Sequence, residues 1–191
     1  MSCRKEEFVK GQHFHIYNRS VANLRLFKND DDYLYFINKI KPNIIKYQAA
    51  VFAYCLMPNH FHFLLRQNSD KPVYLIFNDL NNSYVQYFNK KYSRTGHVYQ
   101  GSLQHKRVRK ERYLIALCQY IHYNPKEAEL VNNLSEWKYS NYLEWIGQRK
   151  ESLFNDELLK TFFVGCELYR QRIKEYEIFL KNNEFTELLF D

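Results

Sequence analysis

The sequence predicts an α+β fold, in which a four-stranded antiparallel sheet carries helices on one face and is followed by further helices. Three observations predict this fold. Strand-like and helix-like patterns alternate in the order βαββαβ, and only helical patterns follow them. The chain of 191 residues is long enough for one domain with a real core. With 46% hydrophobic residues and only 5 Gly and 4 Pro, it is neither disordered nor collagen-like.

The first half of the pattern holds three strands and one helix. His13–Arg19 is rich in aromatic and β-branched residues and predicts the first strand. The run Asn29–Asp32 offers N-cap side chains to a helix, which we expect Pro42 to kink or divide. The apolar run Ala49–Met57 predicts a second strand, and after a Pro-Asn turn His60–Leu65 predicts a third.

The second half of the pattern holds a helix, a strand and another helix. Val73–Tyr92 predicts a helix, although the run Asn81–Ser83 weakens its pattern. His97–Arg109 alternates well enough to predict the fourth strand. The next helix should run over Glu111–Tyr123 and stop before Pro125, because a residue that precedes proline avoids the helical region.

This order of elements is the ferredoxin-like arrangement, an antiparallel sheet with its two helices on one face. The other face should be open to solvent or used for binding. Beyond Pro125 the patterns predict helices only. One of them is long and amphipathic, with apolar residues at Leu168, Ile173, Tyr176, Phe179 and Leu180.

The charge of the chain is divided unevenly. Residues 1–150 carry 23 basic and 12 acidic side chains, a net charge of +11, whereas residues 151–191 carry 5 and 9, a net charge of −4. A segment as basic as residues 1–150 is expected to attract a polyanion, because the attraction to phosphates sums over many Lys and Arg side chains. A solvated basic surface gives the same numbers, so charge alone leaves both readings open.

Cysteine usage and hydropathy indicate the compartment. The four cysteines lie far apart, at positions 3, 55, 118 and 166, without the spacing of a metal site. The N-terminus lacks the apolar core of a signal peptide. Tyr47–Leu65 is uncharged, but Pro58, Asn59 and two histidines interrupt it, which a membrane span tolerates poorly. We therefore predict a cytoplasmic protein with no membrane partner.

Two pairs of polar residues can carry chemistry. His60 and His62 project from one face of the predicted strand, and two neutral imidazoles can hold a divalent metal. Tyr120 and Asn124 share one face of the predicted helix. A phenol can act as a nucleophile, and an amide oxygen can bind a hard metal ion. Either pair alone also fits ordinary packing, in a chain with 17 Tyr and 7 His.

The surroundings of these pairs resemble a known family. Cys55–Leu65, with two histidines flanking one phenylalanine, strongly resembles the metal-binding signature of the HUH single-strand tyrosine transposases. The resemblance is closest to the REP-associated branch and its insertion-sequence relatives. Four further segments match in the family's order: His15–Arg19, Tyr99–Gly101, Tyr120–Pro125 and Tyr139–Gly147. The residues that depart from the family's usual ones include no catalytic group: Ser20, Ser102, Tyr123 and Asn141.

The resemblance implies a metal-dependent DNA transposase that cleaves and rejoins single-stranded or hairpin DNA, at the ends of a mobile element or repeat. Tyr120 would be the nucleophile and would form a 5′-phosphotyrosine. His60, His62 and Asn124 would hold Mg²⁺ or Mn²⁺. The candidates for contacts with DNA phosphates are Arg19, Lys106, Arg107 and Arg109.

The resemblance also implies a division of the chain. Residues 1–147 would form the catalytic domain, and residues 148–191 a C-terminal helical extension packed on that domain or associating with it. Both a monomer and a homodimer remain open. We expect His13 and His15 to be strand residues near bound DNA or half-buried ones, and His122 to be structural.

Three alternatives remain at this stage. A replication-initiator or relaxase-type HUH nickase would share the site but not the surrounding motifs. A domesticated, non-catalytic DNA-binding protein would share the fold without the activity. A metal-free RNA-binding ferredoxin-like domain is also conceivable, but the aromatic-glycine strand motif of such domains is missing.

Overall fold

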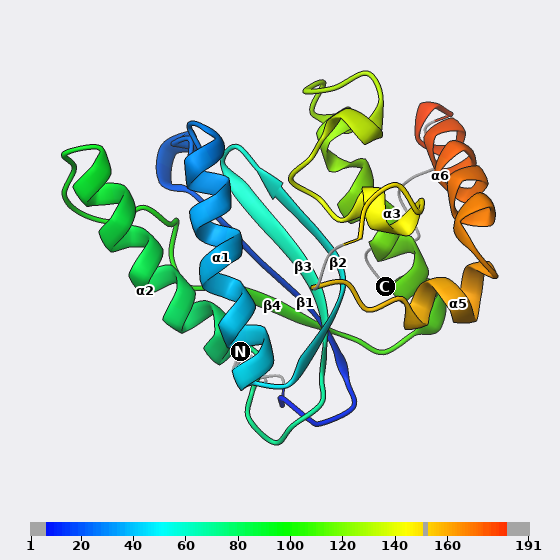
Figure 1. Ribbon diagram of the computed structural model, residues 1–191, viewed down its shortest axis with the longest axis horizontal. Helices are drawn as coiled ribbons and strands as arrows, with labels where there is room; N and C mark the ends of the chain where they lie inside the picture. Colours follow the sequence, from blue (N-terminus) through cyan, green and yellow to red (C-terminus); the bar gives the residue numbers. More distant parts are fainter. Residues whose placement is uncertain (1–6, 151–152, 183–191) are drawn as a thin grey trace, which may run out of the picture.

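The computed structural model describes residues 7–150 and 153–182, and a four-stranded antiparallel sheet lies at its centre (Figure 1). The strands are β1 (His13–Arg19), β2 (Ala49–Met57), β3 (His60–Gln67) and β4 (Gln104–Val108). Their order in the sheet is β2-β3-β1-β4, and every neighbouring pair is antiparallel. The predicted α+β fold with a ferredoxin-like βαββαβ sheet is therefore confirmed.

Two helices cover one face of the sheet, as the pattern predicts. They are α1 (Asp30–Lys46) and α2 (Tyr74–Lys91), which lie together on one side in Figure 1. The core between them and the sheet is rich in aromatic rings, because alternate residues of β1 and β3 point toward the helices. Fully buried examples are Phe14, Phe36, Phe61, Phe63 and Phe77.

The opposite face carries a second core instead of remaining open along its whole width. Helix α3 (Glu111–Glu127) packs on β2 and β3, and α4 (Tyr142–Trp145), α5 (Glu157–Phe163) and α6 (Cys166–Lys181) pack around it. Two 3₁₀ turns, η1 (Val21–Asn23) and η2 (Leu134–Glu136), lie in the connections. Figure 1 shows α3, α5 and α6 on the side of the sheet away from α1 and α2.

Both internal prolines lie inside helices that continue past them, so Pro42 does not divide its helix and Pro125 does not stop the next one. Helix α1 continues through Pro42, because Phe36, Ile40 and Ile44 are buried on one face and hold both halves against the sheet. Helix α3 continues through Pro125 to Glu127. A proline costs one helical hydrogen bond, and tertiary packing can outweigh that cost.

Strand β4 is shorter than predicted. It covers Gln104–Val108, and residues 97–103 before it form a connection along the end of β1 instead of a strand. Tyr99 makes only an isolated bridge with Ser20, and Gly101 has a φ of 77°, which takes the backbone out of the extended region.

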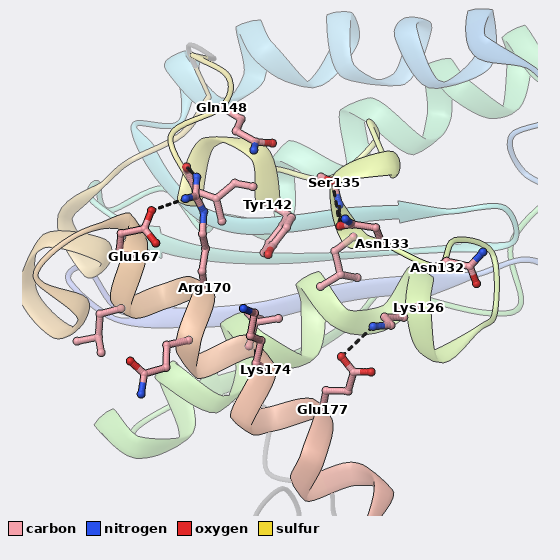
Figure 2. Close-up of a pocket in the computed structure, with 15 residues that line it drawn as sticks. Lys126, Asn132, Asn133, Ser135, Tyr142, Gln148, Glu167, Arg170, Lys174 and Glu177 are labelled. Carbon is pink, nitrogen blue, oxygen red and sulfur yellow. Dashed lines mark hydrogen bonds and ion pairs between the residues drawn. The ribbon is translucent and has the colours of Figure 1, made fainter.

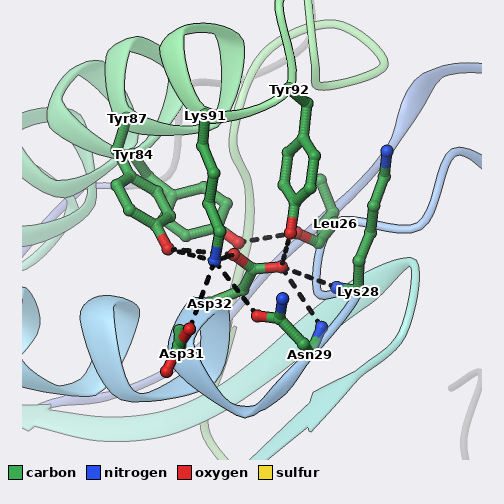
Figure 3. A network of polar contacts seen from close by, with 9 residues as sticks. All are labelled: Leu26, Lys28, Asn29, Asp31, Asp32, Tyr84, Tyr87, Lys91 and Tyr92. Carbon is green, nitrogen blue, oxygen red and sulfur yellow. Dashed lines mark hydrogen bonds and ion pairs between the residues drawn. The ribbon is translucent and has the colours of Figure 1, made fainter.

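A buried carboxylate ties α1 to α2 (Figure 3). Asp32 is fully buried, and it accepts hydrogen bonds from Lys91 at 2.8 Å, from the Tyr92 hydroxyl at 2.7 Å and from the Tyr87 hydroxyl at 3.0 Å. The backbone N–H of Lys28 donates a fourth bond at 2.8 Å. Every lone pair of the carboxylate therefore has a partner, which burial of a charge requires.

The C-terminal helices share the second core. Tyr169 of α6 is fully buried, and its ring lies 4.3 Å from that of Trp145. The predicted division between residues 1–147 and 148–191 stays a prediction, and residues 151–152 and 183–191 of the predicted extension lie outside the described residues.

The uncharged segment Tyr47–Leu65 forms most of the β2–β3 hairpin. Among the residues that the structure describes, no helix has the length and apolar character that a bilayer crossing requires.

Candidate active site

The pairing of β1 with β3 brings the two predicted histidine ligands to the α3 face of the sheet. Phe61 and Phe63 point into the core under α1 and α2, so the alternating His60 and His62 point the other way. Across the β1–β3 pair, His60 lies opposite Arg19, and His62 lies opposite Tyr17. The site is thus built on the two central strands of the sheet.

Helix α3 brings the other two predicted residues to the histidines. The Asn124 Oδ1 atom lies 3.4 Å from His60 Nε2, and the ring centroid of Tyr120 lies 5.5 Å from that of His62. The Asn124 side-chain nitrogen donates to the Tyr120 carbonyl at 2.8 Å, which leaves its oxygen directed at His60. All four predicted residues therefore meet, from two elements that are far apart in the sequence.

A third histidine completes the group. His15 Nε2 lies 2.9 Å from His62 Nδ1, and both rings are buried. On the other side, Asn59 Oδ1 lies 2.6 Å from His60 Nδ1. Each candidate ligand thus has its Nδ1 engaged by a neighbour, and this fixes the orientation of both rings. Such partners are typical of metal-binding histidines.

Burial keeps the imidazoles neutral. It lowers the pKa of His62 well below its usual value, and the nearby His15 and His60 lower it further. Burial also lowers the pKa of His60, against the opposing hydrogen bond with Asn124. The pKa of His15 falls to about 3, because of burial first and the charge of Lys106 second. Neutral imidazole is the form that binds a metal.

The surroundings of Tyr120 disfavour its phenolate. Burial raises the pKa of Tyr120, the Asn124 side chain lowers it, and the charge of Glu127 raises it again. A nucleophilic role therefore requires that its proton leave as the new bond forms or that a cation lie nearby.

A comparison with protein families decides the assignment. The model of the family "Transposase IS200 like" matches residues 8–124, which contain both histidines, Tyr120 and Asn124. The chain belongs to the IS200-like transposase family. The resemblance to HUH tyrosine transposases that the motifs predict is thereby confirmed.

Comparison with the solved structure of a REP-associated transposase supports the fold of this transposase. A REP-associated tyrosine transposase, solved bound to a REP hairpin, is 13% identical and has a TM-score of 0.66, over 81% of this chain and 98% of that one. A putative transposase from Deinococcus radiodurans is 13% identical, with a TM-score of 0.43, over 62% of this chain and 95% of that one. No curated protein matches the chain.

The predicted DNA-contacting residues of the transposase lie on both faces of the sheet. Arg19 and Lys106 lie on the α3 face, where they pair with His60 and His15 respectively. Arg107 points to the opposite face, opposite Phe14, and bonds Gln12 at 3.3 Å. Arg109 is exposed just beyond β4. Contacts of these four residues with DNA phosphates stay predictions. The geometry favours Arg19 and Lys106, because they lie on the same face of the sheet as the candidate site.

The sequence reasoning missed the part played by His15 and Tyr17. Both project from β1 onto the site face, and the ring of Tyr17 lies 5.7 Å from that of His62. Their alternation along β1 was visible in the sequence, but the β1–β3 register that places them was not. His122 is buried and structural as expected, with hydrogen-bond contacts to Tyr169 and Asn141.

A hollow of about 800 Å³ beside the C-terminal end of α3 is a different feature of the transposase (Figure 2). It lies between α4, α6 and the segment around Asn133, and none of the four candidate site residues lines it. Lys126 and Glu177 form an ion pair across it at 2.8 Å, and Arg170 pairs with Glu167. The Lys126–Glu177 pair thus joins α3 to α6, whereas the Arg170–Glu167 pair lies within α6.

Proposed function

We propose that this transposase cleaves and rejoins single-stranded or hairpin DNA through a 5′-phosphotyrosine on Tyr120. The observation that carries the proposal is the meeting of Tyr120 and Asn124 from α3 with His60 and His62 from β3. A nucleophile and three neutral metal-binding groups in one place are what phosphoryl transfer to a tyrosine needs.

The bond changes follow from the chemistry of a phosphodiester. The Tyr120 oxygen attacks the phosphorus, and its proton passes to water. The bond from phosphorus to the 3′ oxygen breaks, and that oxygen takes up a proton to become a 3′-hydroxyl. The phosphotyrosine keeps the energy of the broken bond, so a second 3′-hydroxyl can displace the tyrosine without ATP.

The donor set fits Mg²⁺ or Mn²⁺. Among the described residues, no three His, Cys, Asp or Glu side chains gather as a metal site. The proposed set therefore includes a ligand of another type, the amide oxygen of Asn124, which lies 3.4 Å from His60 Nε2. When bound, the ion would polarise a phosphoryl oxygen of the scissile group. Because His60, His62 and Asn124 carry no net charge, the DNA phosphate itself would supply the negative charge that the ion requires.

The expected partner is DNA that presents an unpaired backbone. The net charge of +11 on residues 1–150 favours a polyanion. The solved REP-associated relative is bound to a REP hairpin, which supports a hairpin substrate here. A cytoplasmic location and the oligomeric state stay predictions.

A covalent-adduct assay tests the proposal. Wild type, Tyr120→Phe and Tyr123→Phe are incubated with Mn²⁺ and 3′-end-labelled hairpin DNA that carries randomised single-stranded flanks, and the denatured proteins are resolved. Tyr123 is the matched control, because its buried ring packs against Tyr176 at 5.6 Å instead of His62. We expect the labelled adduct in wild type and Tyr123→Phe, and none in Tyr120→Phe.

The other outcomes separate the alternatives. An adduct that survives in Tyr120→Phe disproves the assignment of the nucleophile. An adduct that forms but never passes its DNA to an added 3′-hydroxyl strand disproves the rejoining step and leaves only a nicking activity. Binding without any adduct indicates a non-catalytic DNA-binding protein.

A further inference from the structure

We propose that a second hollow, between α2 and residues 97–103, holds an unpaired nucleobase of the DNA that the transposase cleaves. The proposal rests on the proposed function and adds a site at which DNA sequence is read. The hollow measures about 610 Å³, within the range of small-molecule sites. Its lining from β1, α2 and the 97–103 segment includes none of the candidate catalytic residues.

Helix α2 contributes a stripe of amide side chains to the hollow. Asn78, Asn81, Asn82 and Gln86 follow one another at the spacing of a single helix face, and all four line it. In the described part of the chain, none of these side chains makes a hydrogen bond. Asparagine is a weak helix former, so the stripe costs helix stability, and its exposed members Asn78, Asn82 and Gln86 bury little surface in return. A ligand that binds these amide side chains would account for the stripe.

Two residues of the lining also carry buried polar atoms that the fold leaves without partners. Asn81 Oδ1 and the Tyr99 hydroxyl are both buried, and neither has a hydrogen-bond partner among the described residues. Such groups are rare, because each one has lost its hydrogen bonds with water and has gained no hydrogen bond within the protein. Asn18 of β1, only 3% exposed, lines the same hollow. The amides that a ligand in the hollow can reach are the exposed ones of Asn78, Asn82 and Gln86, and donors and acceptors along the edge of a ligand would pair with them.

The chemistry of the lining favours a base over a phosphate or a metal ion. Of the described residues that line the hollow, none is Lys, Arg, Asp or Glu. Amide groups offer a donor and an acceptor side by side, and they pair with the edge of a base through two hydrogen bonds. The exposed imidazole of His97 adds a flat ring on which an unpaired base can stack.

The 97–103 segment that lines the hollow contacts the same end of β1 as the active site does. The Gln100 N–H donates to the Arg19 carbonyl at 2.8 Å, and Tyr99 bridges Ser20. Arg19 in turn lies opposite His60 in the β1–β3 pair. Asn18 points to the α1 and α2 face, whereas Arg19 points to the site face. DNA held at Tyr120 can therefore place a flanking base in the hollow by passing the 97–103 segment.

Selection from a randomised DNA pool tests the base site. The probe is a hairpin with four randomised nucleotides on each side of its stem, bound without metal so that no cleavage occurs, and the bound fraction is sequenced. Asn78 and Asn82 are both exposed, so the double variant Asn78→Ala/Asn82→Ala should fold at least as well as wild type. Asn38→Ala on α1, also exposed and outside the hollow, is the matched control.

We expect wild type and Asn38→Ala to enrich one base at one flanking position by about tenfold, the scale of a good pair of hydrogen bonds. The double variant should lose that enrichment and keep the affinity for the whole pool within twofold. Equal enrichment in the double variant, or no enriched position in wild type, overturns the base site. The adduct assay on the same probe is independent of this result, so the base site and the phosphotyrosine mechanism can fail separately.

Discussion

His15 and His62 share one hydrogen bond between two buried imidazoles, at 2.9 Å from Nε2 to Nδ1. Only one proton lies between these two nitrogens. If His62 Nδ1 carries it, His62 Nε2 keeps its lone pair free on the side of Tyr120 and Asn124. If His15 carries it, the His62 proton occupies Nε2 and blocks metal binding. We therefore expect His15 to act as a positioning residue for His62, by accepting the hydrogen bond that His62 Nδ1 donates.

This relationship predicts the effect of replacing His15. His15→Leu keeps most of the buried volume but removes the acceptor, and it should weaken Mn²⁺ binding by about tenfold or more. His15→Gln should restore much of the affinity, because its amide oxygen can accept the same hydrogen bond from His62 Nδ1. Titration calorimetry with Mn²⁺ in the presence of a short DNA measures both. His13→Leu, two residues earlier on the same face, is the control, and an equal loss there would indicate a structural effect only.

Replacement of the metal-binding groups should separate cleavage from binding. His60→Ala and His62→Ala should abolish strand cleavage and leave DNA affinity within a few-fold, because affinity comes from dispersed basic contacts. Asn124→Ala should reduce cleavage less, since water can replace one neutral oxygen ligand. Cleavage rates and fluorescence anisotropy with the same hairpin pool measure the two effects. Greater sensitivity of Asn124 than of either histidine would reverse this ranking of the ligands.

The sequence predicts which residues of one helix or one strand share a face, but it does not predict the contacts between strands and helices that are far apart in the sequence. Helical and strand spacing place Tyr120 beside Asn124 and His60 beside His62, because both periodicities are local. The pairing of β1 with β3 is not local, so the bond from His15 to His62 could not be predicted. The continuation of α3 through Pro125 has the same origin, since the packing that outweighs the proline comes from the second core.

The register of β4 predicts unequal effects of its basic residues on DNA binding. Lys106 lies on the site face, whereas Arg107 faces the other way and bonds Gln12. Lys106→Gln and Arg19→Gln should each reduce the slope of log affinity against log salt by about 0.7, the value for one phosphate contact on a single strand. Arg107→Gln should leave the slope unchanged. Anisotropy titrations over a range of salt measure it, and a larger effect of Arg107 would place the DNA on the opposite face.

The Asp32 network predicts how stability depends on pH. Burial alone would raise the pKa of the Asp32 carboxyl, but hydrogen bonds from Lys91, Tyr92, the Lys28 backbone and Tyr87 outweigh it, and the pKa is lowered. A carboxyl with a lowered pKa in the folded state contributes stability above its unfolded pKa of about 4. That contribution is lost as the pH falls through the lower folded value.

Asp32→Asn should therefore destabilise the protein at neutral pH and much less in acid. At pH 7 the loss should be about 3 kcal/mol, because the substitution leaves Lys91 without the buried charge it pairs with. Urea unfolding at pH 7 and at pH 3 measures the free energy of unfolding, and the gap between the variant and wild type should narrow at the lower pH. Asp79→Asn breaks the exposed pair with Lys46, at 3.0 Å, and should change little at either pH, because exposed ion pairs contribute little. If the gap at pH 3 equals that at pH 7, the network acts through the shape of Asp32 and not through its charge.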